Sequence, residues 1–172
     1  MILYVVRHGQ TEANVNHLFN GINEGDLNKN GIQQANELAA IIKNIDIDYI
    51  YCSPLKRTIH TANILNVNNR PLYKDNRLIE RDCGLYTLKP SNLIKDKSKL
   101  YLKNENEYNE FESYDSILNR LDSFIKELKE KYTDENILIV THGDIVYAFQ
   151  DLLNSKNETY PKTCELSKFE LK

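Results

Sequence analysis

The sequence predicts a single α/β domain, a three-layer sandwich in which a largely parallel sheet is flanked by helices. The chain has 172 residues, the size of one domain. Two short, continuous apolar runs, at 2–6 and 136–141, are typical of strands buried on both faces of a sheet. Between them apolar residues recur at helical spacing, and strands that alternate with helices form parallel sheets. We therefore expect one domain over residues 1–172.

The first half of the chain is predicted to contain two further strands and two helices. Apolar residues recur at helical spacing after Asn28, a good N-cap residue, and predict a helix to about Lys43. Residues 48–52 are a strand candidate, and residues 71–75 give a weaker strand signal. Ser53 followed by Pro54 is typical of an N-cap with proline at the first helical position, so a second helix is predicted from Pro54 to about Leu65.

The second half begins with a polar segment, 87–114, in which lysines are followed by glutamates. It predicts a mobile, partly helical excursion with solvated charges, and we expect a short lid-like insertion at about 85–114. Apolar residues from Ile117 to Tyr132 then predict an amphipathic helix. The strand at 136–141 is followed by a predicted helix at 144–153, and residues 163–171 alternate like a final edge strand.

Composition excludes several classes of protein. The formal net charge is −3, which argues against a general nucleic-acid binder. No apolar run approaches about 18 residues, so no membrane span is expected. The chain begins on a strand without the basic region or the small-residue cleavage site of a signal peptide, and a cytoplasmic location is expected. Three cysteines without CxxC spacing indicate reduced, buried thiols: Cys52, Cys83 and Cys164.

Several polar side chains follow predicted strands, and in open α/β sheets ligands bind outside the carboxyl ends of the strands. These residues are Arg7, His8, Asn14, Arg57, Glu80 and His142. Arginines bind phosphate oxygens in pairs of hydrogen bonds, and a histidine can attack phosphorus. A protonated carboxyl can supply the proton for the leaving oxygen. None of these steps requires a metal, so the residue set predicts a metal-free phosphate site without a cofactor.

Four segments of the chain resemble the signature segments of the histidine phosphatase superfamily, also called phosphoglycerate-mutase-like proteins. The segments are RHGQTEAN at 7–14, SPLKRTIHTA at 53–62, LIERDCG at 78–84 and VTHG at 140–143. They occur in the order of the family, and the resemblance covers nearly the whole chain. It implies a phosphoglycerate-mutase-like fold and a reaction through a phosphohistidine.

The resemblance also implies a role for each matching residue. His8 matches the nucleophile, His142 the second histidine of the phosphate pocket, and Glu80 the general acid and base. The matching phosphate-binding positions are Arg7, Asn14, Arg57 and Gly143. Asn20 and Gly21 lie in the segment LFNG, which is similar to backbone that approaches the substrate.

Two alternatives concern the acid. The family often continues with a tryptophan-containing segment after Gly84, whereas this chain has Leu85-Tyr86-Thr87. Glu80 is therefore the least secure of the matches, and Asp82 is an alternative acid. A structural ion pair of Glu80 with Arg81 is the other interpretation.

The expected activity is that of a phosphatase acting on a small phosphorylated substrate, as a monomer or homodimer. Similar mutases carry a longer insertion with an arginine pair, and no arginine lies between Arg81 and Arg120 here. A phosphoglycerate-type mutase and a catalytically silent phospho-ligand binder are the alternatives, and the substrate stays open. We expect no catalytic role for His17 or His60. Packing or surface roles are favoured for Tyr86, Lys89 and Tyr101.

Overall fold

The sheet has five strands in the order β3-β2-β4-β1-β5. The structure, a computed structural model, describes residues 1–105, 107–153 and 159–171. The strands are β1 (Ile2–Arg7), β2 (Tyr49–Cys52), β3 (Leu72–Lys74), β4 (Asn136–Thr141) and β5 (Leu166–Glu170). The first four are parallel, and β5 pairs antiparallel with β1 at one edge. This is the largely parallel sheet that the sequence predicts, with the final edge strand in its expected place.

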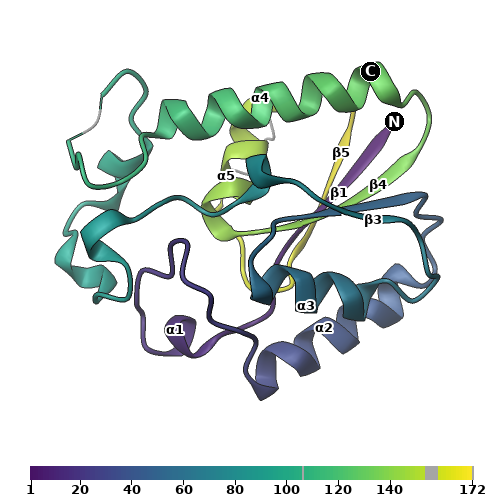
Figure 1. Ribbon diagram of the computed structural model, residues 1–172, viewed down its shortest axis with the longest axis horizontal. Helices are drawn as coiled ribbons and strands as arrows, with labels where there is room; N and C mark the ends of the chain where they lie inside the picture. The colour runs from purple at the N-terminus through teal and green to yellow at the C-terminus, as the bar shows by residue number, and fades with distance from the viewer. Residues whose placement is uncertain (106, 154–158, 172) are drawn as a thin grey trace.

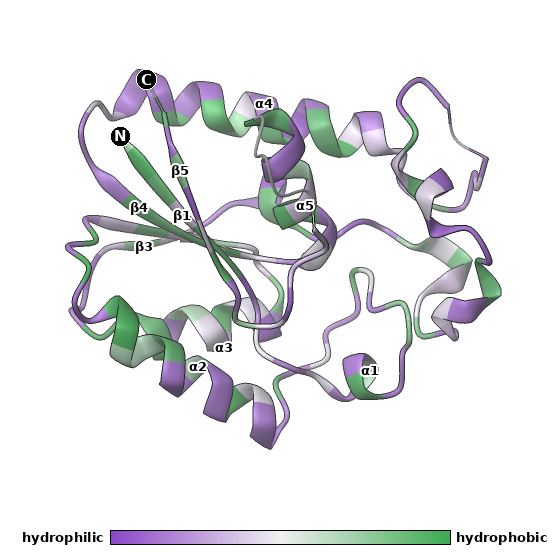
Figure 2. Cartoon of the chain, turned by 180° about the vertical axis from the view of Figure 1, so that it is seen from behind, coloured by the Kyte–Doolittle hydropathy of each residue, from purple (hydrophilic) through white to green (hydrophobic). Residues whose placement is uncertain are grey.

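Helices cover both faces of the sheet (Figure 1). On one face lie α2 (Lys29–Ile42) and α3 (Lys56–Leu65), and on the other lie α4 (Tyr114–Lys131) and α5 (Gly143–Leu152). A short helix, α1 (Glu12–Val15), follows the first strand outside these layers. Figure 2 shows apolar residues along the strands and on the helix faces that meet them. The three-layer α/β sandwich is thereby confirmed.

The two apolar strands, β1 and β4, lie side by side in the interior of the sheet, and their carboxyl ends determine where the site lies. β1 pairs with β4 in register from Ile2 opposite Asn136 to Arg7 opposite Thr141. The ladder extends one residue further, because His8 N–H donates to the carbonyl of Thr141 at 2.9 Å. Burying an aliphatic side chain in such a strand contributes roughly 1.5–3 kcal/mol, so this pair is firmly held. The residues that follow both strands therefore emerge together.

The start of α3 differs from the prediction. The helix begins at Lys56, and its N-cap is Leu55, which makes no side-chain capping bond. Ser53 is not the N-cap because its N–H still donates to the carbonyl of Val140 at 3.1 Å. The chain thus stays paired with the sheet through Ser53 and turns into the helix afterwards.

The segment at 87–114 is partly helical, as expected. Its helical parts are short 3₁₀ helices, Ser91–Leu93 and Lys97–Tyr101. Most of its charged side chains are exposed, as predicted, but Glu112 is partly buried in an ion pair with Arg120. Beneath the charges the segment folds around a small apolar cluster of Cys83, Ile94, Leu100 and Phe111. The sequence did not predict this apolar cluster, because most residues of the segment are polar.

The three cysteines are free, with Cys52 and Cys83 buried and Cys164 partly exposed. Over the described ranges, none of the helices has the length and apolarity needed to cross a membrane.

Candidate active site

A pocket of about 720 Å³ lies where the parallel strands end. Six of the predicted site residues line it: Arg7, His8, Asn14, Asn20, Gly21 and Glu80. Arg57 and His142 are fully buried behind the lining and contact His8. The carboxyl ends of β1 and β4 thus bring together side chains that are far apart in the sequence.

His8 is held with one ring nitrogen free of its proton. The side chain is 1% exposed, and Nδ1 lies 2.7 Å from the carbonyl oxygen of Gly9. A carbonyl only accepts, so Nδ1 carries the hydrogen and Nε2 carries the lone pair. Burial, then Arg57, then Arg7 hold the pKa of His8 well below its usual value of 6.5. His8 is therefore a neutral imidazole with an unprotonated Nε2.

The loop that carries His8 packs closely against α2. A Cβ atom on Gly9 would lie 2.5 Å from the carbonyl oxygen of Gly31, so this approach requires glycine at position 9. The N–H of Gly9 also donates to the hydroxyl of Thr61 on α3 at 3.1 Å. Both helices on this face of the sheet thus hold the loop that carries His8 in place.

Arg57 lies in the first turn of α3 and is fixed by three acceptors. Its Nε donates to Nε2 of His8 at 3.2 Å, and its terminal nitrogens donate to the carbonyls of Asn23 at 2.5 Å and Gly21 at 2.7 Å. Burial lowers its pKa to about 10, which leaves it protonated at neutral pH. Gly21 thus contributes by orienting the arginine, in addition to lining the pocket.

Arg7 and Asn14 are presented by β1 and α1. Arg7 donates to the carbonyl of Pro161 at 2.7 Å, and its guanidinium lies 5.3 Å from the centre of the Tyr160 ring. Asn14 Oδ1 accepts from both the N–H and the hydroxyl of Thr11, each at 3.0 Å. With its oxygen occupied, Asn14 can serve a ligand only through its NH₂ group. Asn20 donates to the same Thr11 hydroxyl at 3.0 Å.

His142 and Gly143 form the start of α5. His142 is the N-cap residue, and its ring lies edge to face with that of His8, with centroids 5.3 Å apart. Burial, followed by Arg57 and His8, holds the pKa of His142 well below its usual value. Gly143 begins the helix, where free N–H groups favour an anion. A Cβ atom here would collide with the hydroxyl end of the Tyr160 side chain, which would have to move away.

Glu80 is a buried carboxyl in the pocket lining. It is 8% exposed, and its Oε1 accepts from the backbone N–H of Arg81 at 2.9 Å. Burial, with the charge of Asp144 second, raises its pKa to about 7. About half of the Glu80 side chains are therefore protonated at neutral pH.

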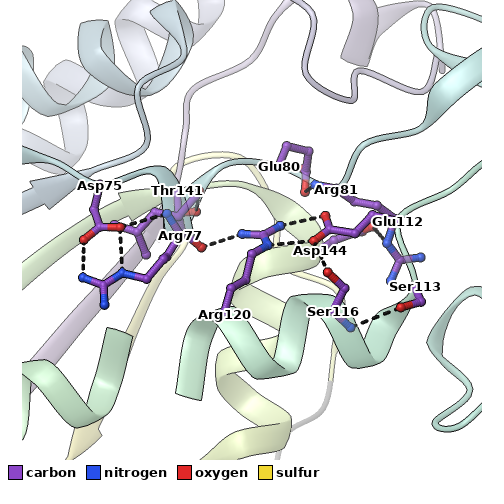
Figure 3. A network of polar contacts seen from close by, with 11 residues as sticks. Asp75, Arg77, Glu80, Arg81, Glu112, Ser113, Ser116, Arg120, Thr141 and Asp144 are labelled. Atoms are coloured by element: carbon purple, nitrogen blue, oxygen red, sulfur yellow. Dashed lines mark hydrogen bonds and ion pairs between the residues drawn. The ribbon is translucent and has the colours of Figure 1, made fainter. Parts of the chain in front are cut away.

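The segment around Glu80 is anchored from two sides. Figure 3 shows Arg120 between the carboxylate of Glu112 and the carbonyl of Arg77, to which it donates at 2.5 Å. The hydroxyl of Thr141, at the end of β4, donates to the carbonyl of Leu78 at 2.8 Å. These bonds fix the backbone just before Glu80 against α4 and the sheet.

Arg81 is not the ion-pair partner of Glu80. Its side chain is fully buried, and its Nε lies 3.2 Å from a carboxylate oxygen of Asp144. The rings of Tyr101 and Tyr114 lie 5.0 and 5.8 Å from its guanidinium. Asp144, in the first turn of α5, is thus the carboxylate that pairs with this cation. The structural ion pair considered for Glu80 is therefore wrong.

Asp82 differs from Glu80 in its surroundings. It is exposed, and its carboxylate accepts from the N–H of Gly84 at 2.8 Å. Asp82 is not among the residues that line the pocket. Its environment offers neither the burial nor the position that an acid requires, and this favours Glu80.

Sequence reasoning missed several residues that line the pocket or lie directly behind it. Ser53, expected as a cap, lies 2.7 Å from Nε2 of His142. The insertion and the chain after α5 add Lys97, Leu100, Tyr101, Tyr160 and Lys162 to the lining. No local signal marks these residues, because their packing onto the site is set by long-range contacts.

The side chains expected to lack a catalytic role lie in different places. Exposed His17 lines the rim of the pocket, whereas His60 is paired with Asp26 at 2.9 Å outside the lining. Tyr86 packs against Phe19 and Phe111. Lys89 lies over the Tyr86 ring. Tyr101 contacts Arg81 and also lines the pocket.

Possible metal ligands are dispersed. Among the residues that the structure describes, histidine, cysteine, aspartate and glutamate side chains form no group of three or more that could hold a metal ion.

Comparison with known proteins places the site in a family. Residues 3–171 match the model of the histidine phosphatase superfamily (branch 1). The chain is 30% identical over 150 residues to phosphoserine phosphatase 1 of Hydrogenobacter thermophilus, covering 81% of this chain and 70% of that protein. It is 28% identical over 153 residues to the adenosylcobalamin/alpha-ribazole phosphatase of Escherichia coli, covering 85% and 75%.

A solved structure shares the fold. The structure of Bacillus stearothermophilus YhfR superposes with a TM-score of 0.87 at 22% identity, covering 99% of this chain and 91% of that one. At this identity the likeness establishes the architecture alone.

Proposed function

The chain belongs to the histidine phosphatase superfamily, and from this premise we propose that it is a metal-independent phosphomonoesterase that forms a phosphohistidine on His8. The observation that carries the proposal is the state of His8. Its Nδ1 is hydrogen-bonded to a carbonyl, its pKa is low, and its unprotonated Nε2 lies beside Arg57. A histidine in this state needs no prior deprotonation to attack phosphorus.

In the first step Nε2 of His8 attacks phosphorus in line, and the bond from phosphorus to the leaving oxygen breaks. Glu80 gives its proton to that oxygen, so the product leaves as an alcohol. Arg7 and Asn14 donate to the phosphoryl oxygens from the pocket wall. The Arg57 N–H that lies on Nε2 of His8 has to move to a phosphoryl oxygen when substrate binds, because Nε2 must be free to attack.

In the second step water attacks the phosphohistidine. The carboxylate of Glu80 takes a proton from the water, the N–P bond breaks, and inorganic phosphate leaves. Glu80 has a pKa of about 7, so both its acid and its base form are populated near neutral pH. One carboxyl can therefore serve both steps.

A panel of phosphomonoesters tests the proposal. The panel should include phosphoserine and alpha-ribazole phosphate, after the names of the relatives, together with sugar phosphates and nucleotides. Release of inorganic phosphate and migration of phosphate to a second hydroxyl are measured together, because they separate a phosphatase from a mutase. We expect release that is lost in His8→Ala. Binding of phosphomonoesters without turnover or a labelled His8 would instead identify a silent binder.

A further inference from the structure

We propose that Ser53 is a positioning residue that fixes the proton of His142 on Nδ1, where it can be donated to the phosphoryl group. Its consequence for catalysis rests on the proposed function, whereas the position of the proton does not. The structure places this serine and this histidine side by side at the carboxyl ends of adjacent strands.

The backbone brings the two side chains together. β2 and β4 are neighbouring parallel strands with Cys52 opposite Val140. The N–H of Ser53 donates to the carbonyl of Val140 and extends the ladder by one residue. The Ser53 hydroxyl then lies 2.7 Å from Nε2 of His142, and both residues are 0% exposed. At this depth water does not compete for either group.

The hydroxyl has one place for its hydrogen. Ser53 Oγ has a second neighbour, the backbone N–H of Leu55 at 3.4 Å, which is itself a donor. Among the described residues, Nε2 of His142 is thus the one hydrogen-bond acceptor within reach of the Ser53 hydroxyl. Buried hydroxyl hydrogens are nearly always hydrogen-bonded, so Ser53 donates to Nε2. Nε2 must then carry a lone pair.

The second nitrogen follows from the first. The low pKa of His142 makes its ring neutral, and a neutral imidazole has one N–H. With Nε2 as acceptor, that N–H is on Nδ1. Nδ1 of His142 is buried and makes no hydrogen bond to any residue in the described part of the chain. A buried N–H without an acceptor, next to the His8 ring, is a donor kept for a ligand oxygen.

The same serine can also serve the charged state. A phosphoryl dianion favours protonation of His142, and Nε2 then gains a hydrogen. The Ser53 hydroxyl can rotate and accept it, so the ring keeps its orientation in both states. An alanine at position 53 can make neither hydrogen bond, so His142 can then adopt both the Nδ1–H and the Nε2–H tautomer.

The first test is spectroscopic and needs no substrate. Correlation spectra of ¹⁵N-labelled protein distinguish protonated from unprotonated ring nitrogens, and the His142 signals are assigned by their loss in His142→Gln. We expect the wild type to carry its proton on Nδ1 of His142. Ser53→Ala should shift the population toward the Nε2–H form. A wild-type proton on Nε2 would overturn the proposal, whatever the activity of the protein.

The second test measures turnover. Complete removal of a hydrogen-bond donor to an oxyanion typically lowers kcat 100-fold to 1,000-fold. In Ser53→Ala the donor on Nδ1 is lost in only part of the molecules, so kcat should fall by roughly 10-fold to 100-fold. Binding of vanadate should weaken in parallel. Ser53→Cys keeps the volume with a weak donor, and it should also lose turnover.

Tyr51→Phe is the control, because it removes a buried hydroxyl that bonds Tyr132, away from the pocket, and not His142. It should lose a similar amount of thermal stability with little loss of kcat. If Ser53→Ala and Ser53→Cys both keep the Nδ1–H tautomer and wild-type kcat, Ser53 only fills space and the proposal fails. Should Ser53→Ala not fold, the wild-type spectrum and Ser53→Cys decide.

Discussion

The proposed role of Glu80 predicts an alkaline limb in the pH dependence of kcat/KM, with an apparent pKa of about 7. A general acid acts only when protonated, and burial beside Asp144 raises the pKa of Glu80 from 4.5 to about 7. At pH 7 an ordinary glutamate is protonated in about one molecule in 300, whereas Glu80 is protonated in about half. The environment thus increases the acid form roughly 150-fold at pH 7.

The perturbation is Glu80→Gln, which keeps the shape and removes the proton. General acid catalysis contributes about 100-fold to 10,000-fold, so this loss is expected with an alkyl phosphate, whose leaving group needs the proton. With p-nitrophenyl phosphate the loss should be far smaller, because nitrophenolate leaves without protonation. The alkaline limb should disappear in the variant.

Rapid-quench measurement of His8 phosphorylation isolates the first step, since Glu80 also acts as the base in the second. Asp82→Asn is the control, because Asp82 is exposed and bonds Gly84. It should leave the limb and the rate unchanged. An equal loss for both leaving groups in the first step, or a limb that persists in Glu80→Gln, would refute the reasoning. Leaving-group dependence in Asp82→Asn would move the acid to Asp82.

Four further predictions concern the nucleophile, the metal, the buried acid and the core. His8→Ala should abolish phosphate release while His60→Ala keeps it, and a phosphate label trapped on His8 should survive alkali and be lost in acid. EDTA should not inhibit, since arginines and a histidine meet the phosphate charge; restoration of activity by added magnesium or zinc would contradict this. The raised pKa of Glu80 contributes stability below pH 4.5, and this contribution is lost as the pH rises through about 7. Glu80→Gln should therefore raise the free energy of unfolding at pH 8 by up to about 3 kcal/mol, with a higher melting temperature, and should change it little at pH 4. Phe149→Ala, in the fully buried core, should cost about 3–5 kcal/mol in urea unfolding.

The sequence predicted the layers and the central part of the site well, because both depend on local patterns. Apolar runs identify buried strands, and parallel strands end at one edge, so residues that follow them must meet there. His8 and His142 lie together for this reason. The strand ends alone are enough to predict that contact.

The contacts that were missed have no local pattern. Ser53 before a proline has the pattern of a helix cap, and the pairing of its N–H with Val140 overrides that preference. The partner of Arg81 is Asp144, far along the chain, and not adjacent Glu80, which the sequence had offered as one alternative. The pocket walls from the insertion depend on an apolar cluster spread over a polar segment. Such features follow from tertiary packing, which periodicity does not encode.

The position of β1 in the sheet determines when the proposed nucleophile, His8, becomes ordered during folding. β1 is central, yet its two neighbours are β4 and β5, which come from the last third of the chain. During synthesis, Arg7 and His8 have no strand beside them until residues 136–141 have left the ribosome. Contacts between such distant segments form slowly, because a long loop must close first. The histidine that is made among the first residues is therefore among the last to be locked in place, and a nascent chain cut short before β4 has no organised nucleophile.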